Sequence, residues 1–196
     1  MQPYIFSKQD EEREKKWETY SSIFSQYVDF YHEELLKNKS YDFVRKYLKD
    51  RSINKDQVKK FKIGYVQKSP NFFDKLKNNF NIEDILETGL FYLDEKKKIY
   101  IERFRGRLIF PINNISGKPI ALGGRIIEKS DFLAKYINSP ETSFFKKGSN
   151  LYNLDLARKF SNKLDEIFLV EGYMDVVGLS KNGIENSVAN LGTALT

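Results

Sequence analysis

The sequence predicts an α+β region followed by the beginning of an α/β region with an incomplete parallel sheet. Aromatic residues spaced by three and four positions predict one long helix over about 9–37. Alternating apolar residues over 90–127 predict strands that pair in hairpins. A strand, a helix and a second strand with short joints follow over 166–191, which is the pattern of a parallel βαβ unit.

The long helix at the start of the chain carries its aromatic residues on one face. These residues are Trp17, Tyr20, Phe24, Tyr27 and Tyr31. Aromatic side chains at this spacing indicate a face that packs on a core or a docking surface, rather than a platform for stacking bases.

Short elements are predicted between this helix and the hairpins. Helices are expected over 41–50, 55–60, 71–79 and 81–88, and a strand over 61–66. Ser40 and Asn54 are predicted N-caps, because their side-chain oxygens can accept backbone N–H groups at a helix start. Gly89 is expected to end the last of these helices.

The central strands are predicted as two hairpins, 90–93 with 99–101 and 107–113 with 118–127. Residues 128–150 have the composition of a loop, and a helix over about 154–161 follows.

The composition changes near 150–165, where we predict a boundary between a first domain, 1–160, and a second, 161–196. The second is expected to contain a strand over 166–170, a helix over 174–181 and a strand over 186–191. Because a two-stranded parallel sheet cannot bury both its faces, we expect the second domain to be only partly contained in the chain.

The composition limits the function. The chain has 196 residues, no cysteine and one histidine, which excludes disulfides and zinc ribbons and disfavours Cys–His or Ser–His catalysis. No apolar run approaches the roughly 20 residues of a membrane span, and the N-terminus is too charged for a signal peptide. We therefore expect a cytoplasmic protein without a membrane partner. The net charge of +6 fits a polyanionic partner such as nucleic acid.

Glu171 is the first candidate for chemistry. It follows an apolar strand, predicted to be buried, and precedes Gly172 and a helix, and ligands of parallel sheets bind at the carboxyl ends of the strands. Asp175 lies four residues later and can join Glu171 at a hard cation such as Mg²⁺. Asp175 could equally serve only as a helix N-terminal carboxylate, and Glu171 only as a surface charge.

A basic segment precedes this pair of acids. Arg103, Arg105 and Arg107 alternate, so a strand there would place all three on one face. Arg125 follows two glycines that permit a close backbone approach by a ligand. Further along, the loop composition includes Lys135, Tyr136, Asn138, Lys146 and Lys147, which suit phosphate contact, stacking and hydrogen bonding. The alternative explanation is that the arginines only keep the edge of a strand soluble.

These residues fall in segments that resemble the bacterial replicative DNA primases. The segments occur in the family's order: RFRGRLIFPI (103–112), GGR (123–125), KYINSPET (135–142), KKGSNLYNL (146–154), VEGYMD (170–175) and NLGTALT (190–196). Two earlier segments, YLKDRSI (47–53) and FKIGYV (61–66), are also similar to the family. The first 40 residues resemble it only loosely. Gly106 and Lys146 depart from the residues common in the family.

The resemblance implies an α+β basic N-terminal subdomain followed by the beginning of an α/β Toprim domain. It implies synthesis of short RNA primers on single-stranded DNA from ribonucleoside triphosphates, with Mg²⁺ or Mn²⁺. Glu171 matches the Toprim glutamate, a general acid/base or metal-site residue, and Asp175 matches the second acid of that motif. The positions that match the family's nucleic-acid and nucleotide cleft are Arg51, Arg103, Arg105, Arg125, Lys135, Tyr136, Asn138 and Lys147.

The same resemblance implies parts outside this chain. A zinc-binding domain normally precedes the region, an Asp-x-Asp motif normally follows it, and a C-terminal region binds the replicative helicase. We therefore expect residues 1–196 alone not to make primers. Two other classes stay open: another Toprim enzyme, such as a topoisomerase or nuclease, and a non-catalytic single-stranded DNA-binding module.

Overall fold

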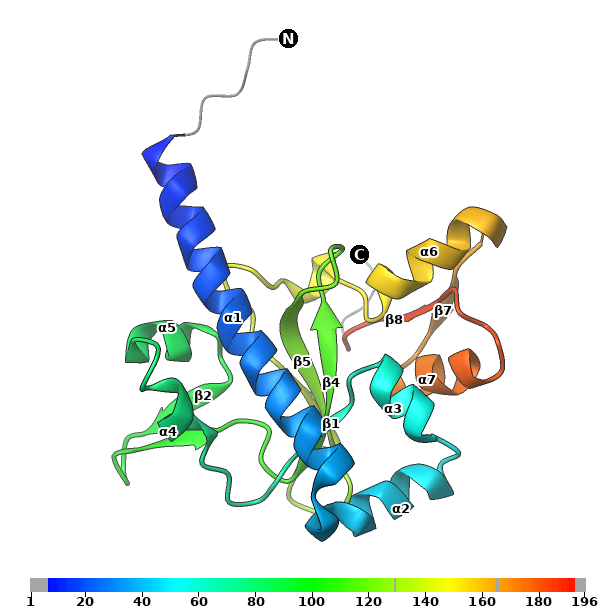
Figure 1. The fold of residues 1–196 in the computed structure, drawn as a ribbon, viewed down its shortest axis with the longest axis horizontal. Helices are drawn as coiled ribbons and strands as arrows, with labels where there is room; N and C mark the ends of the chain where they lie inside the picture. Colours follow the sequence, from blue (N-terminus) through cyan, green and yellow to red (C-terminus); the bar gives the residue numbers. More distant parts are fainter. Residues whose placement is uncertain (1–6, 129, 165, 193–196) are drawn as a thin grey trace.

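A four-stranded antiparallel sheet with the strand order β1-β4-β5-β6 forms the centre of the protein (Figure 1). The computed structural model describes residues 7–128, 130–164 and 166–192. The strands of the sheet are β1 (Gly64–Val66), β4 (Arg107–Asn113), β5 (Pro119–Ile126) and β6 (Tyr136–Asn138). The two longest strands, β4 and β5, are almost entirely buried, so the sheet forms much of the core.

Helix α1 (Lys8–Lys37) lies diagonally across this sheet and contacts β1 and β5 (Figure 1). Its predicted aromatic face is confirmed: Tyr20, Phe24, Tyr27 and Tyr31 are each at most 3% exposed. Trp17 is partly buried and packs on Phe144, with ring centroids 5.3 Å apart. These residues are core, as the helical spacing predicted.

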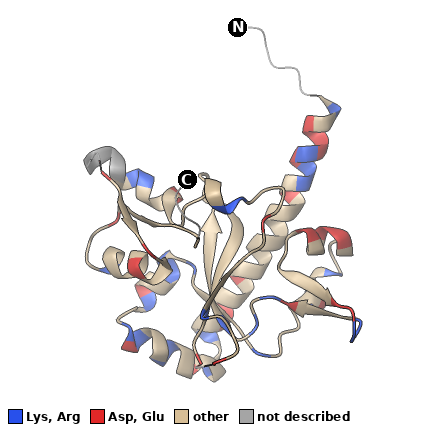
Figure 2. Ribbon diagram, turned by 180° about the vertical axis from the view of Figure 1, so that it is seen from behind, with Lys and Arg blue, Asp and Glu red and all other residues tan. Residues whose placement is uncertain are grey.

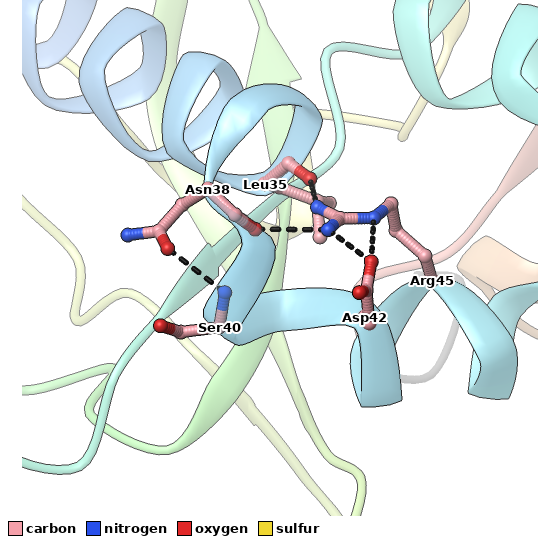
Figure 3. Close-up of polar contacts among 5 residues, drawn as sticks. All are labelled: Leu35, Asn38, Ser40, Asp42 and Arg45. Carbon is pink, nitrogen blue, oxygen red and sulfur yellow. Dashed lines mark hydrogen bonds and ion pairs between the residues drawn. The ribbon is translucent and has the colours of Figure 1, made fainter.

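The junction between α1 and α2 (Asp42–Asp50) differs from the prediction (Figure 3). Ser40 does not cap α2; it lies in a 3₁₀ turn, and its N–H donates to Asn38 Oδ1 at 2.9 Å. The guanidinium of Arg45 instead donates to the carbonyl oxygens of Leu35 and Asn38 at the end of α1. A cation at a helix C-terminus satisfies carbonyls that lack an intrahelical partner, so Arg45 fixes the turn between the helices.

The other short elements lie close to their predicted places. They are α3 (Lys55–Lys60), α4 (Phe72–Leu76), α5 (Ile82–Glu87), β2 (Phe91–Asp94) and β3 (Ile99–Glu102). Asn54 caps α3 as predicted, because its Oδ1 accepts the N–H groups of Asp56 and Gln57. Gly89 follows α5 with a φ of +69°, a conformation that favours glycine.

Three predictions about the strands are wrong. The predicted strand 61–66 is reduced to β1, because the chain turns at Lys62, which has a positive φ. The region predicted as a loop contains β6, an edge strand of three residues that is too short for an alternating pattern to show. Arg103 and Arg105 do not share a strand with Arg107, because residues 103–106 form the turn between β3 and β4.

The C-terminal region is a parallel βαβ unit, which confirms the predicted α/β class. Its elements are α6 (Leu154–Leu164), β7 (Phe168–Val170), α7 (Tyr173–Lys181) and β8 (Ser187–Ala189). The expectation that β7 is buried is wrong, since Phe168 and Leu169 are 44% and 47% exposed. Within the described residues β7 pairs only with β8. None of the described helices is both long and apolar enough to cross a membrane.

A buried carboxyl group lies beneath α1 and gives a prediction about stability. Glu102 is 3% exposed, and its two oxygens accept the hydroxyl of Tyr31 at 2.7 Å and the N–H of Phe72 at 2.8 Å. Burial raises the pKa of Glu102, and these hydrogen bonds oppose that rise. The folded state therefore holds the proton more tightly than the unfolded state, and the stability that Glu102 contributes falls as pH rises through its folded-state pKa.

We expect Glu102→Gln to remove this pH dependence. A glutamine can accept the N–H of Phe72 and donate to the oxygen of Tyr31, but it does not titrate. The free energy of unfolding of the variant, relative to the unsubstituted chain, should rise from about pH 4 towards pH 7 in urea titrations. The exposed Glu18→Gln is the control. A difference for Glu102→Gln that stays constant with pH would contradict the prediction.

Candidate nucleic-acid and metal site

A depression with a volume of about 450 Å³ lies where the sheet meets the βαβ unit. It gathers residues from β5, β6 and α7, and from the segments that follow α2, β7 and β8. Seven predicted site residues line it: Arg51, Arg125, Lys135, Tyr136, Asn138, Glu171 and Asp175. The fold therefore brings together residues that lie up to 124 positions apart in the sequence.

Glu171 lies between the end of β7 and the start of α7, with its side chain exposed in the depression. Gly172 follows in an extended conformation, and its N–H donates to Asp175 Oδ2 at 3.1 Å. Asp175 therefore closes the first turn of α7, while Glu171 has no hydrogen bond or ion pair with another described residue. Of the two acids, Glu171 is the one with both carboxylate oxygens free of hydrogen bonds to described residues, whereas Asp175 has one oxygen engaged.

Arg125, which lines the depression, is held by two tyrosines. Its Nε donates to the hydroxyl of Tyr47 at 2.8 Å, and its Nη1 donates to the hydroxyl of Tyr136. Its guanidinium carbon lies 5.0 Å from the ring centroid of Tyr136, and that of Arg51 lies 4.9 Å from the ring of Tyr47. Burial raises the pKa of Tyr136, and the charge of Arg125 opposes this. Since Arg125 is only 4% exposed, Arg51 is the more accessible cation.

Asn138 connects the segments on either side of the depression. Its Nδ2 donates to the carbonyl of Leu191, 2.7 Å away, and its Oδ1 accepts the hydroxyl of Tyr173. Both amide atoms are therefore used within the protein. Burial raises the pKa of Tyr173, which favours the protonated hydroxyl that donates this bond.

The backbone that carries Lys135 is supported from below. Arg107, which is 5% exposed, donates from Nη1 to the carbonyl of Lys135 at 3.4 Å. Burial lowers the pKa of Arg107. The side chain of Lys135 is exposed, and no described carboxylate forms an ion pair with it. Arg107 thus holds the loop, and Lys135 is the cation that a ligand would meet.

Two further depressions continue from the first. The second shares Arg51, Arg125 and Lys135 with the first and adds Ser130, Asp131 and Leu133. The third shares Ser130 and Leu133 with the second and adds Lys68 and Arg105. Figure 2 shows Lys and Arg on α2 and on the loops beside the lower end of the sheet. We call this series of three depressions the groove.

Two predicted site residues do not line the groove. Arg103 donates from Nε to the carbonyl of Gly89 at 2.7 Å and lies over the ring of Tyr92. Lys147 lies in a 3₁₀ turn, and its N–H donates to Glu141 Oε1 at 2.9 Å. Arg105 lines only the third depression, where its Nη1 also donates to the hydroxyl of Tyr92.

Several residues of the groove were not predicted from the sequence. Tyr47, Tyr173, Met174, Asn190, Leu191 and Gly192 line it without having been predicted. Tyr47 could have been predicted as a groove residue. It lies on the helix predicted over 41–50, four positions before Arg51, and residues at this spacing lie on the same side of a helix. Tyr173 could have been predicted in the same way, because it stands directly after Gly172, at the start of α7.

The first depression offers two carboxylates to a divalent cation. Mg²⁺ takes oxygen ligands and keeps several waters, so one or two protein carboxylates suffice when a substrate supplies phosphate oxygens. Glu171 and Asp175 line the same depression and fit that role. Over residues 7–128, 130–164 and 166–192, no group of three or more His, Cys, Asp or Glu side chains could hold a metal by itself.

Two protein-family models match the chain. Residues 30–158 match the N-terminal domain of the DNA primase catalytic core, and residues 165–196 match the Toprim domain. The DNA primase of Clostridium acetobutylicum is 41% identical over 188 residues, which are 93% of this chain and 30% of that protein. The DNA primase of Staphylococcus epidermidis is 39% identical over 170 residues, 86% of this chain and 28% of that protein. The chain thus spans less than a third of the length of these relatives.

Solved structures agree with these matches. The Aquifex aeolicus primase, with its zinc-binding and RNA polymerase domains, superposes with a TM-score of 0.83 at 40% identity, covering 92% of this chain and 44% of that one. The DnaG primase catalytic domain bound to single-stranded DNA superposes with a TM-score of 0.84 at 32% identity, covering 93% and 56%. The fold, the order of the motifs and the family matches agree, and the chain belongs to the bacterial DnaG-type DNA primases, containing the N-terminal part of their catalytic core and the start of the Toprim domain.

Proposed function

We propose that the protein carrying this chain is a DNA-directed RNA primer polymerase, which makes short RNA primers on single-stranded DNA from ribonucleoside triphosphates during replication. One observation carries the proposal: the exposed Glu171 opens into the same depression as the cations Arg51, Arg125 and Lys135. A carboxylate beside a row of cations suits an enzyme that places a phosphate ester next to a metal ion.

The groove residues divide into two roles in this proposal. The exposed cations Arg51 and Lys135 bind phosphates of the template or of the nucleotide, and the tyrosines hold Arg125 in place behind them. Asn138 keeps the sheet against the loop after β8 and so fixes the shape of the site. Arg103, Arg105 and Lys147 extend the cationic surface beyond the first depression.

Glu171 is the proposed catalytic and metal-site carboxylate, with Asp175 as the second acid. A bound Mg²⁺ or Mn²⁺ would supply charge neutralisation at the phosphates and a lowered pKa at the attacking hydroxyl. Asp175 orients the start of α7 through the N–H of Gly172, and so fixes the direction from which Glu171 enters the site.

The same proposal includes a division into two domains, 1–160 and 161–196. It also includes the partners of the protein. Of the relatives, one structure contains single-stranded DNA and another a double-stranded DNA oligomer with a 6-nucleotide overhang. For this protein we propose a single-stranded template, an RNA primer and, through a further region of the protein, the replicative helicase. Zinc would belong to a separate domain, because the chain has no cysteine. Such an enzyme would work in the bacterial cytoplasm, at the nucleoid.

The test is incorporation of labelled ribonucleoside triphosphates on a single-stranded DNA template by the longest natural protein that carries this chain. Short labelled RNA that depends on template and divalent cation is expected. Binding of the template without any RNA product would contradict the proposed activity and would leave a DNA-binding module.

The exposed cations of the groove give a separate prediction about binding. We expect Arg51→Ala and Lys135→Ala each to weaken single-stranded DNA binding and to reduce the slope of log K against log salt by about 0.7, the value for one phosphate contact on a single strand. Fluorescence anisotropy of a labelled oligonucleotide at several salt concentrations measures both quantities. Lys118→Ala is the control, because Lys118 is exposed at the opposite end of β5. An equal slope in all three variants would show that Arg51 and Lys135 do not contact the DNA backbone.

A further inference from the structure

An exposed aromatic ring marks the edge of the groove. Phe132 lies in the segment between β5 and β6 and is 97% exposed, the highest value among the large hydrophobic residues of the described chain. A single exposed apolar residue is ordinary on a protein surface. The position of this one is not ordinary, because its two sequence neighbours, Asp131 and Leu133, both line the second depression of the groove.

The backbone beneath this ring is fixed by a local hydrogen-bond pattern. The hydroxyl of Ser130 accepts the N–H of Phe132 at 3.3 Å and the N–H of Leu133 at 3.2 Å. A serine that accepts two successive N–H groups forms a tight turn. The turn directs Asp131 and Leu133 to the groove and leaves the ring of Phe132 in solvent at its rim.

Cations lie next to the turn that carries Phe132. The second depression has the same three cations on its walls as the first, Arg51, Arg125 and Lys135. It also has the carboxylates of Asp131 and Glu128, and Glu128 is paired with Lys68 at 2.6 Å. A strand whose phosphates lie on the exposed cations Arg51 and Lys135 therefore passes beside the turn that carries Phe132.

We propose that Phe132 is a stacking platform for one nucleobase of the single strand whose phosphates lie on Arg51 and Lys135. The inference rests on the proposed function, because it needs a single-stranded nucleic acid in the groove. Interleaved aromatic side chains and cations are the usual means of binding single strands without reading their sequence. A strand with its phosphates at the cations can turn a base outward to the exposed face of the ring.

The first test compares two ligands with the longest natural protein that carries this chain. One is an oligodeoxythymidylate, and the other is the same backbone with abasic residues throughout. Phe132→Ala should weaken binding of the first by about tenfold, within the range for loss of one stacked base, and leave binding of the second unchanged. The salt slope should stay the same, because no phosphate contact is lost. Phe132→Tyr keeps an aromatic face and should bind within about twofold of the unsubstituted chain.

A matched control uses Ile115, which is 49% exposed in the turn at the opposite end of the β4–β5 hairpin. Ile115→Ala should change neither affinity. In a second measurement, Phe132→Trp should lose fluorescence on binding oligodeoxythymidylate, whereas Ile115→Trp should not, after subtraction of the signal of the unsubstituted protein.

The outcomes separate the two proposals. If the unsubstituted chain binds oligodeoxythymidylate and Phe132→Ala binds it equally well, the stacking proposal is wrong and the proposed function stands. If Phe132→Ala weakens the abasic ligand equally, the ring does not act on a base, and the stacking proposal is again wrong. If the unsubstituted longest natural protein binds neither ligand at low salt, both proposals fail.

Discussion

Glu171→Gln is expected to abolish primer synthesis while leaving single-stranded DNA binding intact. The substitution keeps the shape of the side chain and removes its charge, so it removes the one exposed acid in the depression that has no partner in the described protein. Loss of a group that acts on the charge of a transition state lowers the rate on the order of a thousandfold, or about 4 kcal/mol. The cations that bind the DNA backbone are unchanged, so the affinity for the template should stay within about twofold.

The measurement requires a protein that makes primers, so the variant is made in the longest natural protein that carries this chain. Glu166→Gln is the matched control, because Glu166 is an exposed carboxylate just before the same strand and lines none of the three depressions. It should synthesise primers normally. Full activity of Glu171→Gln, or an equal loss in Glu166→Gln, would contradict the assignment of Glu171.

The elements with a strong local pattern could be predicted from the sequence. The aromatic spacing of α1 and the glycines at 89 and 172 each have a local physical cause, and the structure has a helix or a turn at each of them. The strand β6 could not be predicted, since three residues are too few to show a period and their contacts, such as Arg107 with Lys135 and Asn138 with Leu191, join segments far apart in the sequence. Interactions of that kind come from tertiary structure and leave no period in the sequence.

Some features of the candidate site could likewise be predicted from the sequence, and others could not. Glu171, Arg51, Arg125 and Lys135 were predicted and lie together in one depression. The expectation of three arginines on one strand face was wrong, because an alternating sequence also fits a turn between two strands, and Gly106 permits that turn with a φ of +72°. The hydrogen bond between Arg125 and Tyr47 was also not predictable, because the two residues lie 78 positions apart in the sequence.

Gly123→Ala is expected to lower the free energy of unfolding by about 2–3 kcal/mol, as overpacked substitutions in a rigid core do. A Cβ added at Gly123 would lie 2.3 Å from Cζ and 2.4 Å from Cε2 of Tyr173, which is closer than any ordinary contact. The ring of Tyr173 cannot easily move, because it stacks on Phe110 at 5.4 Å and meets the edge of Tyr152 at 4.8 Å. Gly148→Ala is the matched control, since nothing lies within 4 Å of a Cβ there, and its effect should be within about 0.5 kcal/mol.

A double-mutant cycle assigns this cost to the contact between β5 and α7. Tyr173→Ala removes the ring that a Cβ at Gly123 would strike, so in that background Gly123→Ala should cost much less, and the two substitutions should be strongly non-additive in urea unfolding. An equal cost in both backgrounds would show that Gly123 is needed for some other reason. Because Tyr173 also donates to Asn138, a displaced ring would break the link between β6 and α7. We therefore expect Gly123→Ala to reduce primer synthesis as well, even at temperatures where the variant stays folded, because Glu171 stands two residues before Tyr173.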